Sequence, residues 1–83
     1  MSHACGHDIH TAALLLTAKV LCAQRERLRG SVLLIFQCAE EVGSGAYRML
    51  DTGLLDRYRP EAVVGFHCVP LLELGQIGLR RGP

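Results

Sequence analysis

The stretch "SVLLIFQ", residues 31–37, decides the fold that this sequence predicts. It is short, contains β-branched residues and is apolar without interruption between its two polar ends. This is the pattern of a strand that is covered on both faces of a parallel sheet. A second run of the same kind is "AVVGFH", residues 62–67, and "GQIGL", residues 75–79, predicts a third, shorter strand. We therefore expect a small parallel sheet.

Two stretches with helical character alternate with these runs. In residues 9–28 the apolar side chains recur at helical spacing, Asp8 stands where an N-cap is expected, and Gly30 can close the C-terminal end. Residues 46–53, "AYRMLDTG", predict a second, shorter helix. The order helix, strand, helix, strand predicts an α/β fold that contains a βαβ unit with a right-handed crossover.

Composition limits the classes of protein that remain. The chain has 83 residues, 49% of them hydrophobic, and a formal net charge of +1. Such a balance favours a globular core and gives no reason to expect nucleic acid or an anionic membrane as a partner. The apolar runs are too short to span a bilayer, and the N-terminus lacks the order of a secretory signal. We expect the four cysteines to be reduced, in a cytoplasmic protein.

Residues of metal-ligand type stand at the expected strand ends. Glu40 and Glu41 follow the first predicted strand, and His67 ends the second. Cys5 and His7 precede the first predicted helix, a position that follows a strand in an alternating fold. Because the carboxyl ends of parallel strands share one edge of a sheet, these residues are predicted to converge there.

The chemistry of these residues is that of a metal site. Cys5 and His7 flank Gly6, whose backbone freedom lets both side chains turn toward one point, and thiolate and imidazole are good ligands for zinc. Of two neighbouring carboxylates such as Glu40 and Glu41, one can bind a metal while the other accepts a proton. Taken singly, the first pair is also compatible with a polar turn and the second with a solvated surface.

Other residues of this kind have less definite assignments. Cys22 is interpreted as a core residue, and Asp8 can also support a ligand histidine. His3 and His10 are left open between supporting a ligand and contacting substrate. A lone histidine at a strand end is more often a structural residue than a ligand, so the assignment of His67 as a ligand depends on the convergence.

Five segments together resemble a known family. They are "HACGHDIHTAALL", "VLLIFQCAEE", "GLLD", "VVGFHCVP" and "GQIGLRRGP". In this order and at these separations they resemble the dinuclear-metal amidohydrolases of the aminoacylase and carboxypeptidase superfamily. The most similar branch is that of the hippurate and auxin-conjugate hydrolases, which act on N-acyl amino acids. The resemblance implies a partial parallel-sheet βαβ segment of a zinc-peptidase-like catalytic domain.

The resemblance also implies a role for each candidate residue. Cys5, His7, Glu41 and His67 match metal ligands, with Cys5 bridging two ions, and Glu40 matches the general base. The implied cofactors are two divalent ions, from among zinc, manganese, nickel and cobalt. The implied reaction is hydrolysis of the amide bond of an N-acyl amino acid or a peptide-like substrate.

The sequence departs from the family in two respects. Cys38 stands where the family usually has proline, and family members are several times longer than this chain. We expect residues 1–83 to be a partial catalytic domain without the lid or dimerisation domain, and to have little hydrolase activity alone. Its partner is expected to be a second copy or the remainder of the enzyme. The alternatives are a non-catalytic module around a structural zinc and a metal-free interaction fragment.

Overall fold

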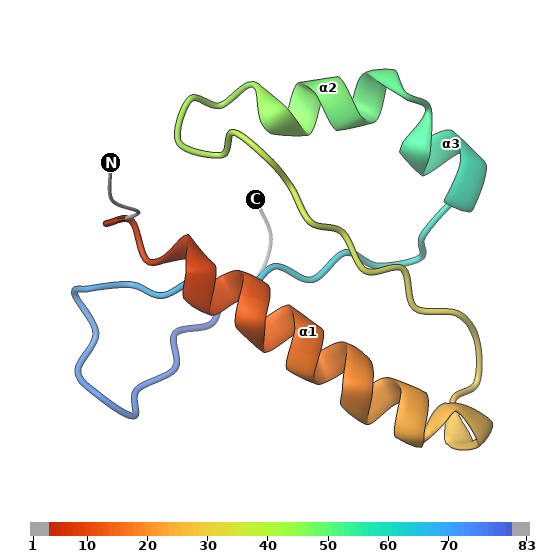
Figure 1. Ribbon diagram of the computed structural model, residues 1–83, viewed down its shortest axis with the longest axis horizontal. Coiled ribbons are helices and arrows are strands. Elements are labelled where there is room, and N and C mark those ends of the chain that lie inside the picture. Colours follow the sequence, from red (N-terminus) through yellow and green to blue (C-terminus); the bar gives the residue numbers. More distant parts are fainter. Residues whose placement is uncertain (1–3, 81–83) are drawn as a thin grey trace.

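The computed structural model describes residues 4–80 and is helical in its regular parts (Figure 1). Within these residues the elements are three α-helices and one short 3₁₀ turn. In chain order they are α1 (His7–Ala23), η1 (Arg25–Arg27), α2 (Gly45–Asp51) and α3 (Leu54–Tyr58). None of the described helices is long and apolar enough to cross a bilayer.

Helix α1 lies where the sequence predicts a helix, but it begins and ends at other residues than predicted. Its alanines and leucines favour helix, and it spans 17 residues before η1 replaces its last predicted turn. The N-cap is Gly6 in the left-handed conformation, with φ of 78°, and not Asp8 as predicted. Asp8 lies instead in the first turn, where its carboxylate complements the helix dipole.

The predicted α/β fold class is wrong for the described residues. Residues 31–37, 62–67 and 75–79 form no strand, and no parallel sheet or βαβ unit exists between residues 4 and 80. No backbone hydrogen bond joins residues 31–37 to 62–67. The physical reason is that a helix makes its hydrogen bonds within one segment, whereas a strand requires a second segment in register.

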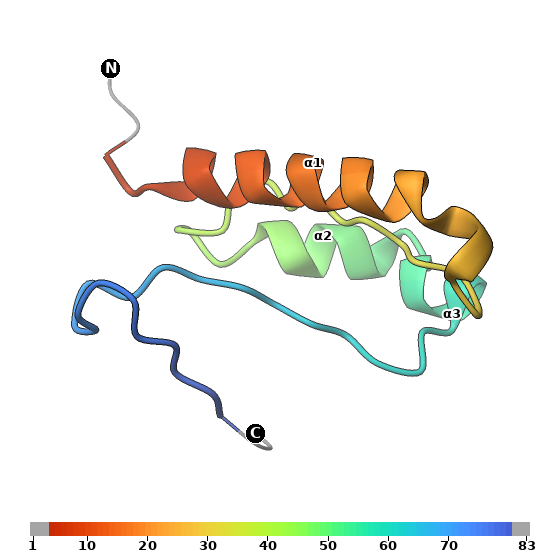
Figure 2. The ribbon, with the colours of Figure 1, turned by 90° about the horizontal axis from the view of Figure 1, so that it is seen from below.

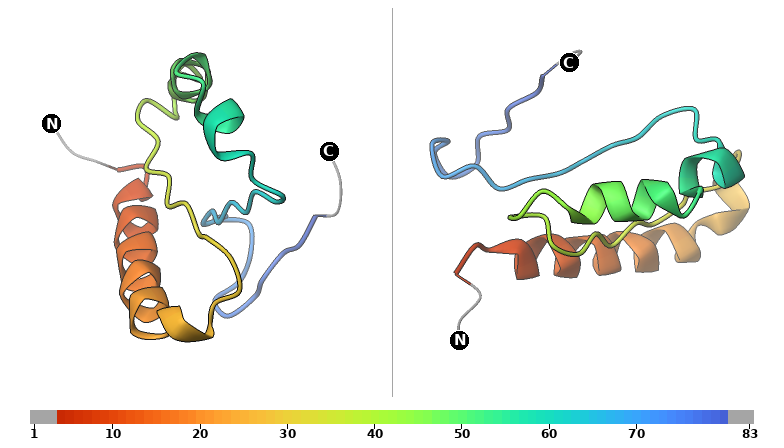
Figure 3. Two further views of the ribbon diagram at one scale, coloured as in Figure 1. Left: turned by 90° about the vertical axis from the view of Figure 1, so that its right-hand side faces the viewer. Right: turned by 90° about the horizontal axis from the view of Figure 1, so that it is seen from above.

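The two longest segments without regular structure nevertheless follow similar courses. Residues 31–38 and 62–68 both run toward the N-terminal end of α1 (Figures 1 and 2). Most of their apolar side chains are exposed, Val64 by 91% and Phe66 by 72%, although Leu34 and Ile35 are half-buried. No hydrophobic residue of the described chain is buried. Residues 69–80 loop away from the helices (Figure 3).

The dimensions agree with this open arrangement. The radius of gyration is 14.8 Å, against about 12 Å for a compact domain of this length. The accessible surface is 8271 Å², against about 4,900 Å² for a compact monomer of this size. The helices and the extended segments are therefore loosely packed against one another. Local contacts determine where the candidate ligand residues lie.

A tight loop precedes α2. Ala39 has a φ of 52°, and the carbonyl of Glu40 accepts a hydrogen bond from the N–H of Gly43 at 2.9 Å. Gly45, the first residue of α2, is buried, because the carbonyl oxygen of Cys38 lies where a Cβ atom would be. We call residues 38–45 the glutamate loop, since the contact between its two ends fixes the place of Glu40 and Glu41.

Candidate metal centre

The N-terminal end of α1 gathers the first group of candidate ligands. Gly6 has a positive φ, so the chain turns sharply between Cys5 and His7. The thiol sulfur of Cys5, a ring nitrogen of His7 and a carboxylate oxygen of Glu41 all lie within 4.8 Å of one another. These three donors come from two segments, the start of α1 and the glutamate loop.

Both glutamates face the imidazole of His7. Its Nε2 lies 3.7 Å from Oε1 of Glu41 and 3.5 Å from Oε2 of Glu40. Two ligands at about 2.1 Å from a tetrahedral ion are about 3.4 Å apart, so either spacing suits a shared cation. Only Glu41 belongs to the group that includes Cys5, which is the arrangement expected if Glu41 is the ligand and Glu40 the neighbouring base.

His67 approaches the same histidine from a distant segment. Its Nε2 lies 3.3 Å from Nε2 of His7, and its Nδ1 lies 2.7 Å from the carbonyl oxygen of Cys68. A carbonyl only accepts hydrogen bonds, so Nδ1 of His67 bears the proton. The Nε2 of His67 therefore bears no proton and faces Nε2 of His7, at about the spacing of two ligands of one ion.

A third imidazole belongs to this cluster. His10, one helical turn after His7, forms a group with His7 and His67 whose donor atoms lie within 4.8 Å of one another. The His10 ring centroid lies 5.1 Å from that of His7 and 4.5 Å from that of His67. The sequence alone does not decide the role of His10, although its spacing of three from His7 places both residues on one helix face. His3 lies outside the described residues.

The donor set fits a divalent transition metal. It combines a thiol, neutral imidazoles and carboxylates, which together suit zinc and its neighbours in the first transition row. The side chain of His7 is 25% exposed, whereas those of Glu40 and Glu41 are 51% and 66% exposed. His7 is thus more buried than either glutamate, and the two carboxylates are the more accessible to solvent.

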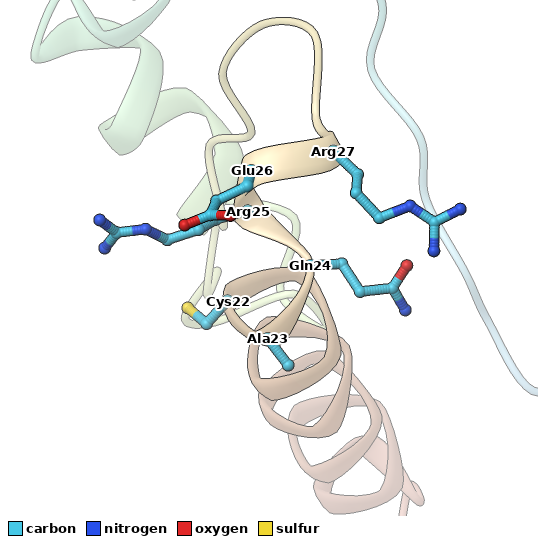
Figure 4. A pocket seen from close by; sticks show the side chains of 6 residues that line it. All are labelled: Cys22, Ala23, Gln24, Arg25, Glu26 and Arg27. Atoms are coloured by element: carbon cyan, nitrogen blue, oxygen red, sulfur yellow. The ribbon is translucent and has the colours of Figure 1, made fainter.

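Among residues 4–80, no such cluster lies at the opposite end of α1. Cys22, which the sequence analysis assigned to the core, is exposed. It lines an open hollow whose other lining residues are all its neighbours in sequence: Ala23, Gln24, Arg25, Glu26 and Arg27. In Figure 4 the side chains of Arg25 and Arg27 point in different directions, so they do not converge on one ligand.

Comparison with known proteins agrees with the resemblance seen in the motifs. Residues 1–82 match peptidase family M20/M25/M40. An N-acetyl-L-cysteine deacetylase of Bacillus subtilis (strain 168) is 47% identical over 81 residues, which are 98% of this chain and 19% of that protein. The IAA-amino acid hydrolase ILR1-like 4 of Arabidopsis thaliana is also 47% identical, over 98% of this chain and 18% of its own length.

A third relative is of the same class. An N-acyl-L-amino acid amidohydrolase of Geobacillus stearothermophilus is 45% identical over 82 residues, which cover 98% of this chain and 22% of that protein. The chain thus spans about a fifth of the length of the relatives it matches. No solved structure matches it significantly. The expected relationship to the amidohydrolases is confirmed, and the chain belongs to peptidase family M20/M25/M40.

Proposed function

We propose that this chain provides part of the catalytic metal centre of a hydrolase that cleaves the amide bond of N-acyl amino acids. The observation that carries the proposal is the meeting of Cys5, His7 and Glu41 donors within 4.8 Å, with Glu40 beside them. The printed names of the relatives, a deacetylase and amidohydrolases among them, support the substrate class.

Each residue has a distinct part in this proposal. Cys5, His7, Glu41 and His67 are the ligands of one or two divalent ions, with zinc, manganese, nickel and cobalt as candidates. When bound, such an ion supplies Lewis acidity, which polarises an amide carbonyl and makes water a better nucleophile at neutral pH.

Glu40 then acts as the proton carrier. Its carboxylate accepts a proton from the attacking water as the new C–O bond forms. It returns that proton to the amide nitrogen as the C–N bond breaks, which releases a carboxylic acid and an amine. The exposed position of Glu40, at 3.5 Å from His7, allows contact with both water and substrate.

Metal binding tests the division of roles between the two glutamates. Glu41→Ala should lower the affinity of the chain for Zn²⁺ or Co²⁺, whereas Glu40→Ala should retain the affinity within about threefold, because only one of them is a ligand. Glu61→Ala, at an exposed site outside the cluster, is the control. Equal losses from both variants would contradict the assignment.

Catalysis is tested in a chimera. The 83 residues replace the matching segment of the Geobacillus amidohydrolase, and hydrolysis of N-acetyl amino acids is measured with Mn²⁺ or Zn²⁺. We expect turnover that Glu40→Ala lowers by about 10²- to 10⁴-fold, with no change from Glu61→Ala. A chimera that binds metal without turnover would favour the non-catalytic metal-binding module instead.

A further inference from the structure

We propose that His10 is a positioning residue for His67, acting through the peptide of Cys68, and is not itself a metal ligand. The inference rests on the proposed function, since it concerns one of the proposed ligands. It assigns different roles to three histidines whose donor atoms all lie within 4.8 Å of one another.

The backbone of Cys68 forms two hydrogen bonds, one through its N–H and one through its carbonyl. The backbone N–H of Cys68 donates to Nε2 of His10 at 2.9 Å. The carbonyl oxygen of the same residue accepts from Nδ1 of His67 at 2.7 Å. Cys68 is therefore hydrogen-bonded to His10 through its N–H and to His67 through its carbonyl. His10 and Cys68 are 58 residues apart in the sequence.

These bonds assign the ring protons. His10 accepts a hydrogen bond at Nε2 from the peptide N–H, so the lone pair of that nitrogen is occupied and its own proton lies on Nδ1. His67 donates from Nδ1, so its Nε2 bears no proton and accepts a hydrogen bond from Nε2 of His7 at 3.3 Å. A cation bound between these two nitrogens would take the place of that proton, so His7 and His67 can serve as ligands, whereas His10 serves as a support.

The support matters because little else holds this segment. Within the described part of the chain, residues 62–67 make no backbone–backbone hydrogen bond, and Val64 and Phe66 are largely exposed. Without ladder bonds on either side, the orientation of the His67 ring depends on the contacts of Cys68. His10 provides the link from α1 to that peptide.

The thiol of Cys68 offers a competing explanation. Its sulfur also lies 3.1 Å from Nε2 of His10, and it approaches Gly6. A thiol is a weak hydrogen-bond donor compared with a backbone amide, so we assign the link to the N–H. Cys68→Ala removes the thiol and keeps the amide, which allows the two routes to be separated.

The test uses two readouts on the full chain. Long-range ¹H–¹⁵N correlation spectra of the metal-free chain report which nitrogen of His67 bears the proton, and titration with Co²⁺ in visible absorption reports metal affinity. The variants are His10→Leu, which removes the acceptor, and His10→Gln, whose side-chain oxygen restores one. Cys68→Ala is the third, and Thr17→Val, farther along α1, is the control for loss of a polar helix residue.

The expected pattern is specific. In the wild-type chain His67 bears its proton on Nδ1. His10→Leu should mix its two tautomers and weaken Co²⁺ binding by about 10- to 100-fold, the usual effect of losing a group that orients a ligand. His10→Gln should recover most of that loss, and Cys68→Ala and Thr17→Val should stay within about twofold of wild type. Circular dichroism should show unchanged helix content in each case.

Several results would overturn the proposal. They are a His67 proton on Nε2 in the wild-type chain, no change in tautomer with His10→Leu, or a loss of Co²⁺ binding with His10→Gln as severe as with His10→Leu. An effect of Cys68→Ala equal to that of His10→Leu would assign the link to the thiol and also overturn it. If the wild-type chain binds no Co²⁺, the proposed function fails, while the tautomer spectra still decide the role of His10.

Discussion

The two ends of α1 contain similar residue types and differ in what lies opposite them. At the N-terminal end, Cys5 and His7 meet donors from the glutamate loop and from the segment that ends at His67. At the C-terminal end, Cys22 lines a hollow formed only by residues 22–27. The difference shows that a cysteine at a helix end becomes part of a candidate site when distant segments bring further donors to it.

The largest expected effect compares a cysteine from each end. Cys5→Ser should weaken Co²⁺ binding by about 100-fold or more and remove the thiolate-to-metal absorption band, because it deletes a proposed ligand. Cys22→Ser should change neither quantity measurably, since Cys22 belongs to no group of donors within the described residues. Spectrophotometric titration of both variants checks this. Equal effects at the two positions would contradict the distinction between the ends.

The glutamate loop provides the next comparison. Gly45→Ala places a Cβ onto the carbonyl of Cys38, so the loop must shift, with a loss of about 1–3 kcal/mol in the free energy of unfolding. We expect metal affinity to fall by about tenfold, since Glu41 moves with the loop.

Gly65→Ala is the matched control, because a Cβ there meets nothing within 4 Å and its φ is not positive. Thermal unfolding by circular dichroism and Co²⁺ titration give the two quantities. A tolerated Gly45→Ala would show that the loop does not depend on this contact.

Alanine substitutions at two glycines, Gly6 before α1 and Gly30 after η1, should separate effects on stability from effects on metal binding. Gly6 has a φ of 78° and Gly30 a φ of 124°, so alanine is strained at both, by about 1–2 kcal/mol. Only Gly6 lies between proposed ligands. Gly6→Ala should therefore weaken metal binding severalfold, whereas Gly30→Ala should lower the melting temperature and leave the metal affinity unchanged. A metal effect at Gly30 would show that the two ends are coupled.

The smallest effect concerns the helix dipole. Asp8 complements the N-terminal end of α1, whereas no basic residue occupies its last turn. Ala23→Lys should add about 0.3–1 kcal/mol to the stability of α1 at low salt, measured by thermal circular dichroism. Metal affinity should stay the same, because the new charge lies at the end that holds no candidate ligand.

Local sequence signals predict the helices and not the extended segments. The spacing of alanine and leucine in residues 9–28 depends on contacts a few positions apart, and α1 forms there. The β-branched run at 31–37 predicts a strand only on the condition that another segment pairs with it. That condition is not local, and the described structure does not meet it.

The candidate site illustrates the same limit. The sequence predicts Glu41 and His67 near His7 on the ground that all three share the edge of a sheet. In the structure these side chains lie together without a sheet, through the turn of the glutamate loop and the bonds of Cys68. The support by His10 depends on a peptide 58 positions away, a pairing that no pattern within one segment indicates. The catalytic and ligand roles themselves stay predictions.

The closed ends of the glutamate loop have a consequence for protein engineering. Gly45 admits no larger side chain, and Ala39 already adopts a φ of 52° that β-branched residues rarely tolerate. Val42, at the tip and 75% exposed, is subject to neither restriction. A fluorescent label or an affinity tag introduced at position 42 would therefore report on the loop while its geometry is preserved, whereas randomised libraries should leave positions 39 and 45 untouched.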